Sequence, residues 1–148
     1  MTINQISVFL ANRTGQLAQI CTTLAENDIS IVTLALADTT DFGILRMIVS
    51  DHEKARQILT AAGHVVKVTP VFAVTVPDVP GGMAGVAQKL SEAGCDIEYS
   101  YAFAFHHGEK AVLVFRFADP DKAAKVLEKG GYMTLNEHQV EDAATPSA

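Results

Sequence analysis

Residues 72–90, FAVTVPDVPGGMAGVAQKL, repeat the pattern of residues 6–24, ISVFLANRTGQLAQICTTL, which lie 66 positions earlier. Each stretch begins with alternating apolar residues, which predict a strand, and continues through a turn that contains glycine. Each ends with apolar residues at helical spacing, so a helix is expected after the turn. Aligning the two stretches places Val8 on Val74, Gly15 on Gly81 and Leu24 on Leu90. The chain is therefore expected to contain an internal repeat.

The same order of patterns continues after each predicted helix. Two strand-like runs joined by a polar turn come next, then a second helix that starts at an acidic residue and ends near glycine, then a fourth strand. In the first copy the strand-like runs are 29–37 and 43–50, and the second helix starts at Asp51 and ends near Gly63. In the second copy the runs are 95–105 and 110–118, and the second helix starts at Asp119-Pro120 and ends near Gly130-Gly131.

The order β-α-β-β-α-β predicts an α+β fold made of two ferredoxin-like βαββαβ units, each an antiparallel sheet with helices on one face. We assign residues 1–68 to the first unit and residues 69–140 to the second, and we expect the two units to be packed together. Residues 141–148 are small and polar, which predicts a flexible C-terminal tail. In the run 95–105, alternation places Ile97, Tyr99, Tyr101, Phe103 and Phe105 on one face, and Glu98 is expected opposite Arg116.

Composition excludes several classes of function. Of the 148 residues, 49% are hydrophobic and the formal net charge is −6. A nucleic-acid-binding surface is usually basic, so neither nucleic acid nor an anionic membrane is an expected partner. The sequence contains no apolar run near the roughly 20 residues that span a bilayer, and no signal peptide at its start, so a cytoplasmic protein is expected.

The residues that commonly bind metals do not form a recognisable ligand set. Cys21 and Cys95 lie far apart and are interpreted as small reduced hydrophobic residues. His106 and His107 fall in a predicted turn without a recognisable third ligand, so a solvated turn is favoured over a metal site. No metal and no cofactor is expected.

The two turns that precede the first helix of each unit are the most informative feature. A helix N-terminus offers unpaired N–H groups, and glycine lets an anion approach that backbone closely. Asn12 and Asp78 are placed to accept hydrogen bonds from an ammonium group, so each turn has the parts needed to hold a zwitterion. The alternative interpretation is that Asn12, Thr14 and Asp78 cap the helix and shape the turn.

The repeated unit and its glycine turns resemble the ACT domain, a small module that binds amino acids in metabolic regulation. Residues 37–46, ADTTDFGILR, and residues 97–103, IEYSYAF, are similar to segments of short bacterial proteins that consist of two ACT domains. The turn Asp78-Val79-Pro80-Gly81 keeps the pattern of Asp or Asn, then Pro, then Gly. In the first turn Thr14 replaces the proline.

The resemblance implies a regulatory protein that binds a free amino acid between two ACT domains. It also implies a homodimer and a separate regulated enzyme as partners. In this family the ligand lies between the glycine turn of one domain and the second strand of the other. Carried over to this sequence, the ligand-binding residues are Asn12, Arg13, Thr14, Gly15, Gln16, Leu17, Ser30, Val32, Asp78, Pro80, Gly81, Gly82, Met83, Glu98 and Tyr99.

Two other classes of function are alternatives. A small acyl-phosphate hydrolase would use Arg13 and Asn12 at the first turn, although the second copy has Val79 at the position of Arg13. RNA binding would use aromatic residues on the sheet, such as Phe115 and Phe117, but few basic residues flank them. No catalytic motif is recognisable, so the sequence predicts a binding protein that is not an enzyme.

Overall fold

The computed structural model describes residues 1–11, 13–38 and 42–144. The chain divides into two compact units, Asn4–Thr69 and a second unit formed by Met1–Ile3 with Pro70–Ala148. We refer to them as the N-terminal and the C-terminal unit. Met1–Ile3, expected in the first unit, group with the C-terminal unit, and Met1 lines a pocket there.

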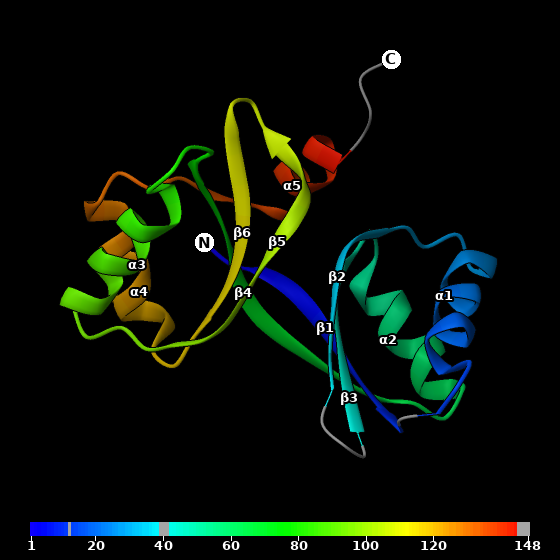
Figure 1. The fold of residues 1–148 in the computed structure, drawn as a ribbon. Helices are drawn as coiled ribbons and strands as arrows, with labels where there is room; N and C mark the ends of the chain where they lie inside the picture. Colours follow the sequence, from blue (N-terminus) through cyan, green and yellow to red (C-terminus); the bar gives the residue numbers. More distant parts are fainter. Residues whose placement is uncertain (12, 39–41, 145–148) are drawn as a thin grey trace. The chain divides into compact units, whose positions relative to one another are not determined.

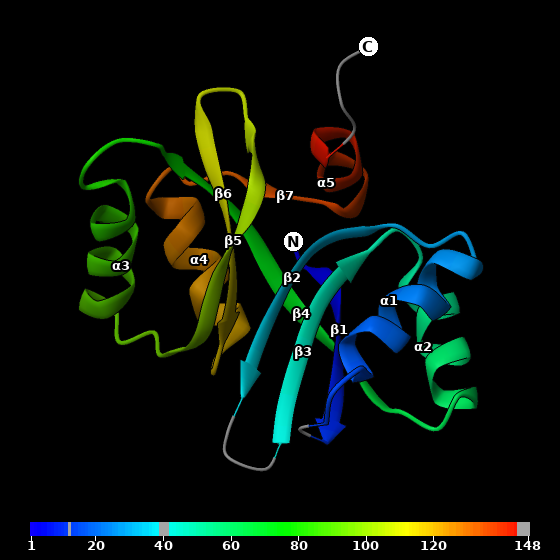
Figure 2. The same cartoon turned by 45° about the vertical axis from the view of Figure 1, so that its right-hand side comes forward.

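The N-terminal unit has the expected order of elements (Figure 1). Its strands β1 and β2 both pair antiparallel with β3, so β3 lies between them. Helices α1 and α2 lie on the same side of these strands in both views (Figures 1 and 2). The bounds are β1 (Ile3–Ala11), α1 (Gln16–Glu26), β2 (Ile31–Asp38), β3 (Phe42–Val49), α2 (His52–Ala61) and β4 (Val65–Pro77), whose first residues belong to this unit.

The C-terminal unit repeats this order and then adds a helix. Strand β6 lies between β4 and β5 and pairs antiparallel with both. The remaining part of β4 supplies the first strand of this unit, so one continuous strand of 13 residues serves both copies of the repeat. The bounds are α3 (Gly82–Glu92), β5 (Ile97–His107), β6 (Lys110–Phe117), α4 (Pro120–Lys129), β7 (Thr134–Leu135) and α5 (Glu137–Ala144).

The end of the chain differs from the expectation. Strand β7 has only two residues, and α5 takes in the first four residues of the segment expected to be a flexible tail. The reason is a reciprocal cap at the start of α5. The Gln139 N–H donates to Asn136 Oδ1 at 2.8 Å, and the Asn136 N–H donates to Gln139 Oε1 at 2.9 Å. Residues 145–148 lie outside the described residues.

The second helix of each unit is fixed by the same pair of contacts. Asp51 accepts a hydrogen bond from the Lys54 N–H at 3.1 Å and so caps α2, and Lys54 Nζ donates to the Asn27 carbonyl at 2.8 Å. The start of α2 is thereby tied to the end of α1, so the two helices run antiparallel. The equivalent contacts in the C-terminal unit are Lys122 N–H to Asp119 at 3.2 Å and Lys122 Nζ to the Gly94 carbonyl at 3.3 Å.

Each unit has its own hydrophobic core between the sheet and the helices. The alternating apolar residues of the first strands are buried as expected, and they contact apolar residues of the helices. Met83, expected on the apolar stripe of α3, is exposed. In the C-terminal unit the Phe115 and Phe117 rings stack with their centroids 5.6 Å apart, and Phe72 meets Phe117 edge-on at 5.5 Å. Cys95 is buried in this core as a small hydrophobic residue.

Two parts of the prediction for β5 were wrong, the face of Ile97 and the partner of Arg116. The register shifts between Ile97, which pairs with Phe117, and Tyr99, which pairs with Arg116. Ile97 therefore packs against the core, whereas Tyr99 lies on the opposite face of the sheet. Tyr99, and not Glu98, is the partner of Arg116 in the register. The Arg116 guanidinium instead donates to the Pro70 carbonyl at 3.2 Å.

Two further features concern the classes of function considered above. Within the part of the chain that the structure describes, no helix is both long enough and apolar enough to cross a membrane. Among the same residues, no three His, Cys, Asp or Glu side chains gather as a metal site would require.

Candidate functional site

The turn before α1 is built around a glycine in a left-handed conformation. Gly15 has φ +91° and ends the turn as the N-cap of α1, and no side-chain hydrogen bond caps this helix. The Arg13 N–H donates to the Ala11 carbonyl at 2.8 Å, so the backbone folds back directly after β1. Arg13 and Thr14 are exposed. Asn12, the predicted ammonium acceptor of this turn, lies outside the described residues.

Gln16 is the first residue of α1 and carries an unusual polar atom. The side chain is half-buried, and its carbonyl oxygen Oε1 is shielded from solvent without a hydrogen-bond donor among the described residues. A buried acceptor that lacks a donor destabilises a protein by about 1–3 kcal/mol. A change of rotamer of this half-buried side chain would present the acceptor to the N–H group of a ligand beside the glycine turn. The side chain of Leu17, the next residue, packs against the hydrophobic core of the N-terminal unit.

The turn before α3 has the same backbone conformation. Gly81 has φ +90° and is the N-cap of α3, again without a side-chain cap. The Gly85 N–H donates to the Gly81 carbonyl at 2.9 Å, as the Gln19 N–H does to the Gly15 carbonyl at 3.0 Å. The other predicted residues of this turn, Asp78, Pro80 and Met83, are exposed. The N-cap residues of both helices are glycines, so neither N-cap has a side chain that could cap its helix.

The two turns differ at the first residue of the helix. Gly82 occupies the position of Gln16 and is buried. A Cβ atom at Gly82 would lie 2.0 Å from the Pro77 carbonyl oxygen, so no side chain fits there. The C-terminal turn consequently lacks the buried acceptor that Gln16 supplies to the N-terminal turn. The two copies share a backbone and differ in the polar groups that they present.

The predicted strand residues of the N-terminal unit do not meet its turn. Leu10 and Asp38 both pair with Gly43, so the turn after β1 lies level with the end of β2. Ser30 precedes β2 and exchanges hydrogen bonds with Ser50, both at 3.0 Å. Ser30 lies eight residues before Asp38 along the chain. At a rise of about 3.3 Å per residue, the two residues are roughly 26 Å apart along the strand direction. Val32 lies near the same end, at the irregularity in β2.

The same holds in the C-terminal unit. Pro77, directly before the second turn, pairs with Lys110, and Lys110 pairs with His107. Tyr99 lies eight residues along β5 from His107, or roughly 26 Å away at about 3.3 Å per residue, and Glu98 is adjacent to Tyr99. Within each unit, then, the structure brings together the residues of the glycine turn but not the strand residues. A site that uses both needs the turn of one ACT-like unit and the second strand of another.

One residue of interest was missed by the sequence analysis. His64 follows the left-handed Gly63 at the end of α2, and its Nε2 is shielded from solvent without a hydrogen-bond partner among the described residues. Because α1 and α2 run antiparallel, His64 lies at the same end of the helix pair as Gln16. The only signal of His64 in the sequence is its alignment with Tyr132 in the second copy of the repeat. Tyr132 also lies near the first helix of its unit, because its hydroxyl is 3.3 Å from the point where a Cβ on Gly85 in α3 would lie.

Comparison with known proteins agrees with the repeated βαββαβ fold. The sequence model of a family described as "ACT domain pair" matches residues 1–142. No protein with a curated description matches the chain. The structure of protein BT0572 from Bacteroides thetaiotaomicron is similar, with 37% identity, a TM-score of 0.88, and coverage of 95% of this chain and 96% of that one.

More distant structures share the fold. The ligand-free regulatory subunit of aspartate kinase from Thermus thermophilus has 15% identity and a TM-score of 0.62, and the alignment covers 86% of this chain and 91% of that one. The regulatory subunit from Thermus flavus has 15% identity and a TM-score of 0.59, with 86% and 92% covered. The repeated βαββαβ unit, the paired glycine turns and the match over residues 1–142 lead to one conclusion: the chain belongs to the family of ACT domain pairs.

Proposed function

We propose that this ACT domain pair is a regulatory protein that binds a free amino acid at its strand-to-helix glycine turns. A small-molecule-binding regulatory role follows from the family. The observation that carries the finer proposal is the buried Gln16 Oε1, an acceptor without a donor at the first residue of the helix that follows Gly15.

The chemistry of the N-terminal turn suits a zwitterion. The ammonium group of an amino acid would donate to Gln16 Oε1, which relieves the cost of leaving that acceptor unpaired. The carboxylate would lie against the positive end of α1, where Gly15 lets it approach the backbone. His64 Nε2 lies at the same end of the helix pair and, in the tautomer that carries a proton there, would donate to the carboxylate.

The strand residues complete the proposed site from a second ACT domain. Ser30, Val32, Glu98 and Tyr99 lie too far from the turn of their own unit to contact the same small ligand. They would contact a ligand held by a turn of another ACT domain, as the family resemblance implies. A homodimer would supply such turns and strands in matched pairs.

The wider role follows from the relatives. The two Thermus proteins that share the fold are regulatory subunits of aspartate kinase. We extend the regulatory role to this chain, but not the identity of the regulated enzyme. Binding of an amino acid to this chain would change the activity of a separate enzyme. The chain itself would carry no catalysis. Arg13, on which the hydrolase alternative depends, is exposed on the turn.

A thermal-shift screen of the twenty amino acids at millimolar concentration tests the proposal. A ligand that binds the folded state raises the melting temperature by an amount set by its concentration over its Kd. The amino acid that raises it most is then titrated calorimetrically into Gln16→Met, which keeps the length of the side chain and removes the acceptor. Gln19→Met is the matched control, because Gln19 is exposed on the same helix.

We expect Gln16→Met to weaken binding by about tenfold or more, which corresponds to one lost hydrogen bond to a charged group. Gln19→Met should bind as the parent protein does. Gly81→Val tests the second turn by straining a residue at φ +90°. If no amino acid changes the melting temperature, the proposed ligand class is wrong, and if Gln16→Met binds normally, the ligand lies elsewhere.

A further inference from the structure

We infer that the proposed amino-acid site is present once per chain, in the N-terminal unit, and that Tyr132 closes its copy in the C-terminal unit. This inference rests on the proposed function and adds to it which of the two glycine turns holds the ligand. The two turns share one backbone conformation, so the difference between the copies comes from the side chains around them.

The first observation is the place of the unpaired polar atoms. Among the described residues, the buried side-chain atoms without a hydrogen-bond partner are Gln16 Oε1 and His64 Nε2. Both belong to the N-terminal unit, and both lie at the end of its helix pair where α1 begins. Buried polar atoms in native proteins are nearly always paired, so two unpaired atoms at one place point to a ligand that pairs them. The described residues of the C-terminal unit include no such atom.

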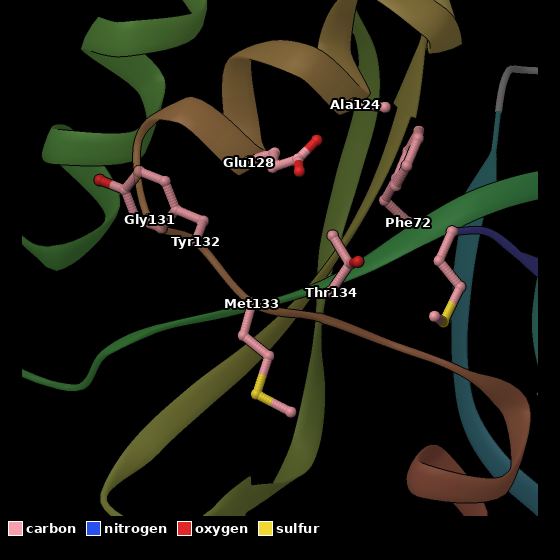
Figure 3. A pocket seen from close by; sticks show the side chains of 8 residues that line it. Phe72, Ala124, Glu128, Gly131, Tyr132, Met133 and Thr134 are labelled. Carbon is pink, nitrogen blue, oxygen red and sulfur yellow. The ribbon is translucent and has the colours of Figure 1, made fainter.

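The second observation is that Tyr132 takes the place of His64 in the repeat. Each residue follows a glycine in the left-handed conformation, after the second helix of its unit. The His64 N–H donates to the Leu59 carbonyl at 3.0 Å. In the same way, the Tyr132 N–H donates to the Leu127 carbonyl at 2.9 Å. The two side chains therefore leave the backbone at equivalent points, and the longer tyrosine reaches toward α3 (Figure 3).

Two glycines make room for the tyrosine. A Cβ atom at Gly85 would lie 3.3 Å from the Tyr132 hydroxyl oxygen, and a Cβ atom at Gly130 would lie 3.1 Å from the tyrosine ring. Both distances are shorter than ordinary van der Waals contact, so larger residues at these positions would push the ring away. In the N-terminal unit the equivalent residues are Gln19 and Ala62. The C-terminal unit thus fills with an aromatic ring the space that the N-terminal unit leaves to a smaller histidine.

The turn itself differs in the same sense. Gly82 stands at the position of Gln16, and a Cβ atom there would lie 2.0 Å from the Pro77 carbonyl oxygen. The backbone of the C-terminal turn therefore leaves no place for an acceptor side chain at this position. Because Tyr132 also replaces His64, the C-terminal copy lacks both side chains that are proposed to hold the ammonium group and the carboxylate.

The consequence is a stoichiometry of one amino acid per chain. Calorimetric titration of the full chain, with the amino acid that raises the melting temperature most, should give this value. In a ¹⁵N NMR titration, the amides of Gly15–Leu17 should shift and those of Gly81–Met83 should stay unchanged. Two ligands per chain, or shifts at Gly81–Met83 as large as those at Gly15–Leu17, would overturn the inference and leave the proposed function standing. If no amino acid binds, the proposed function fails, and the single site fails with it.

A transplant of three residues tests the role of Tyr132. His64→Tyr combined with Gln19→Gly and Ala62→Gly gives the N-terminal unit the residues of the C-terminal unit, and should weaken amino-acid binding by at least about tenfold. The matched control carries the same two glycines and keeps His64, so it should bind as the parent protein does. Both variants should keep the circular dichroism spectrum of the parent. Parent-like binding by the triple variant, or an equal loss of binding in the folded control, would overturn the role assigned to Tyr132.

Discussion

Replacing Gln16 with methionine is expected to stabilise the protein in the absence of ligand. Gln16 Oε1 is shielded from solvent and has no donor among the described residues, so the folded state loses the hydrogen bond with water that the unfolded chain makes. That loss is typically about 1–3 kcal/mol. Because the side chain as a whole is half-buried, we take the lower end of the range. Methionine is similar in length and in helix propensity, so it removes the polar atom and changes little else.

The expected gain is about 1 kcal/mol, or a rise of about 2–4 °C in the melting temperature for a chain of this size. Urea unfolding followed by circular dichroism measures it directly, and the m-value should not change. Gln19→Met is the control and should stay within about 0.5 kcal/mol of the parent, because Gln19 is exposed. A destabilisation of Gln16→Met by about 1 kcal/mol or more would show that Oε1 has a partner in the free protein.

Three further perturbations test the fold. Gly82→Ala should lower the unfolding free energy by about 1–3 kcal/mol in urea titrations, because its Cβ would lie 2.0 Å from the Pro77 carbonyl oxygen. Asp51→Ala removes the cap of α2 and should cost about 0.5–2 kcal/mol in the same assay. The hydrogen bond from Arg56 lowers the pKa of Glu53, so an NMR titration of Arg56→Ala should show this pKa rising toward its ordinary value. The stabilisation from the pair is present above the unfolded-state pKa of Glu53 and is lost as the pH falls through the lowered folded-state pKa.

The repeat made most of the fold predictable. The alternating and helical periods in residues 6–24 and 72–90 reflect burial on one face, and each unit buries the expected residues apart from Met83, which is exposed. The capping aspartates and the terminal glycines act through local backbone contacts, so they too can be recognised from sequence. Strand β5 was misjudged because one extra residue at Glu98 places Tyr99 on the face opposite to that of Ile97, and the register shifts again between Ala102 and His106.

The candidate site was only partly accessible to sequence reasoning. Gly15 and Gly81 were recognised because positive φ favours glycine, a preference that depends on the local backbone. The unpaired atoms of Gln16 and His64 depend on how neighbouring helices shield them, which periodicity does not report. The pocket that Met1 lines in the C-terminal unit (Figure 3) was missed for a similar reason. Its lining joins Met1 and Phe72 to residues more than 50 positions later in the chain.

The central claim is that an amino acid binds at the glycine turns. An NMR titration of the ¹⁵N-labelled full chain, with the amino acid that raises the melting temperature most, tests this claim directly. We predict that the largest shifts occur at the amides of Gly15–Leu17, with a second group at Gly81–Met83 if both turns bind. Shifts confined to other elements, or no shifts with any of the twenty amino acids at millimolar concentration, would contradict the claim.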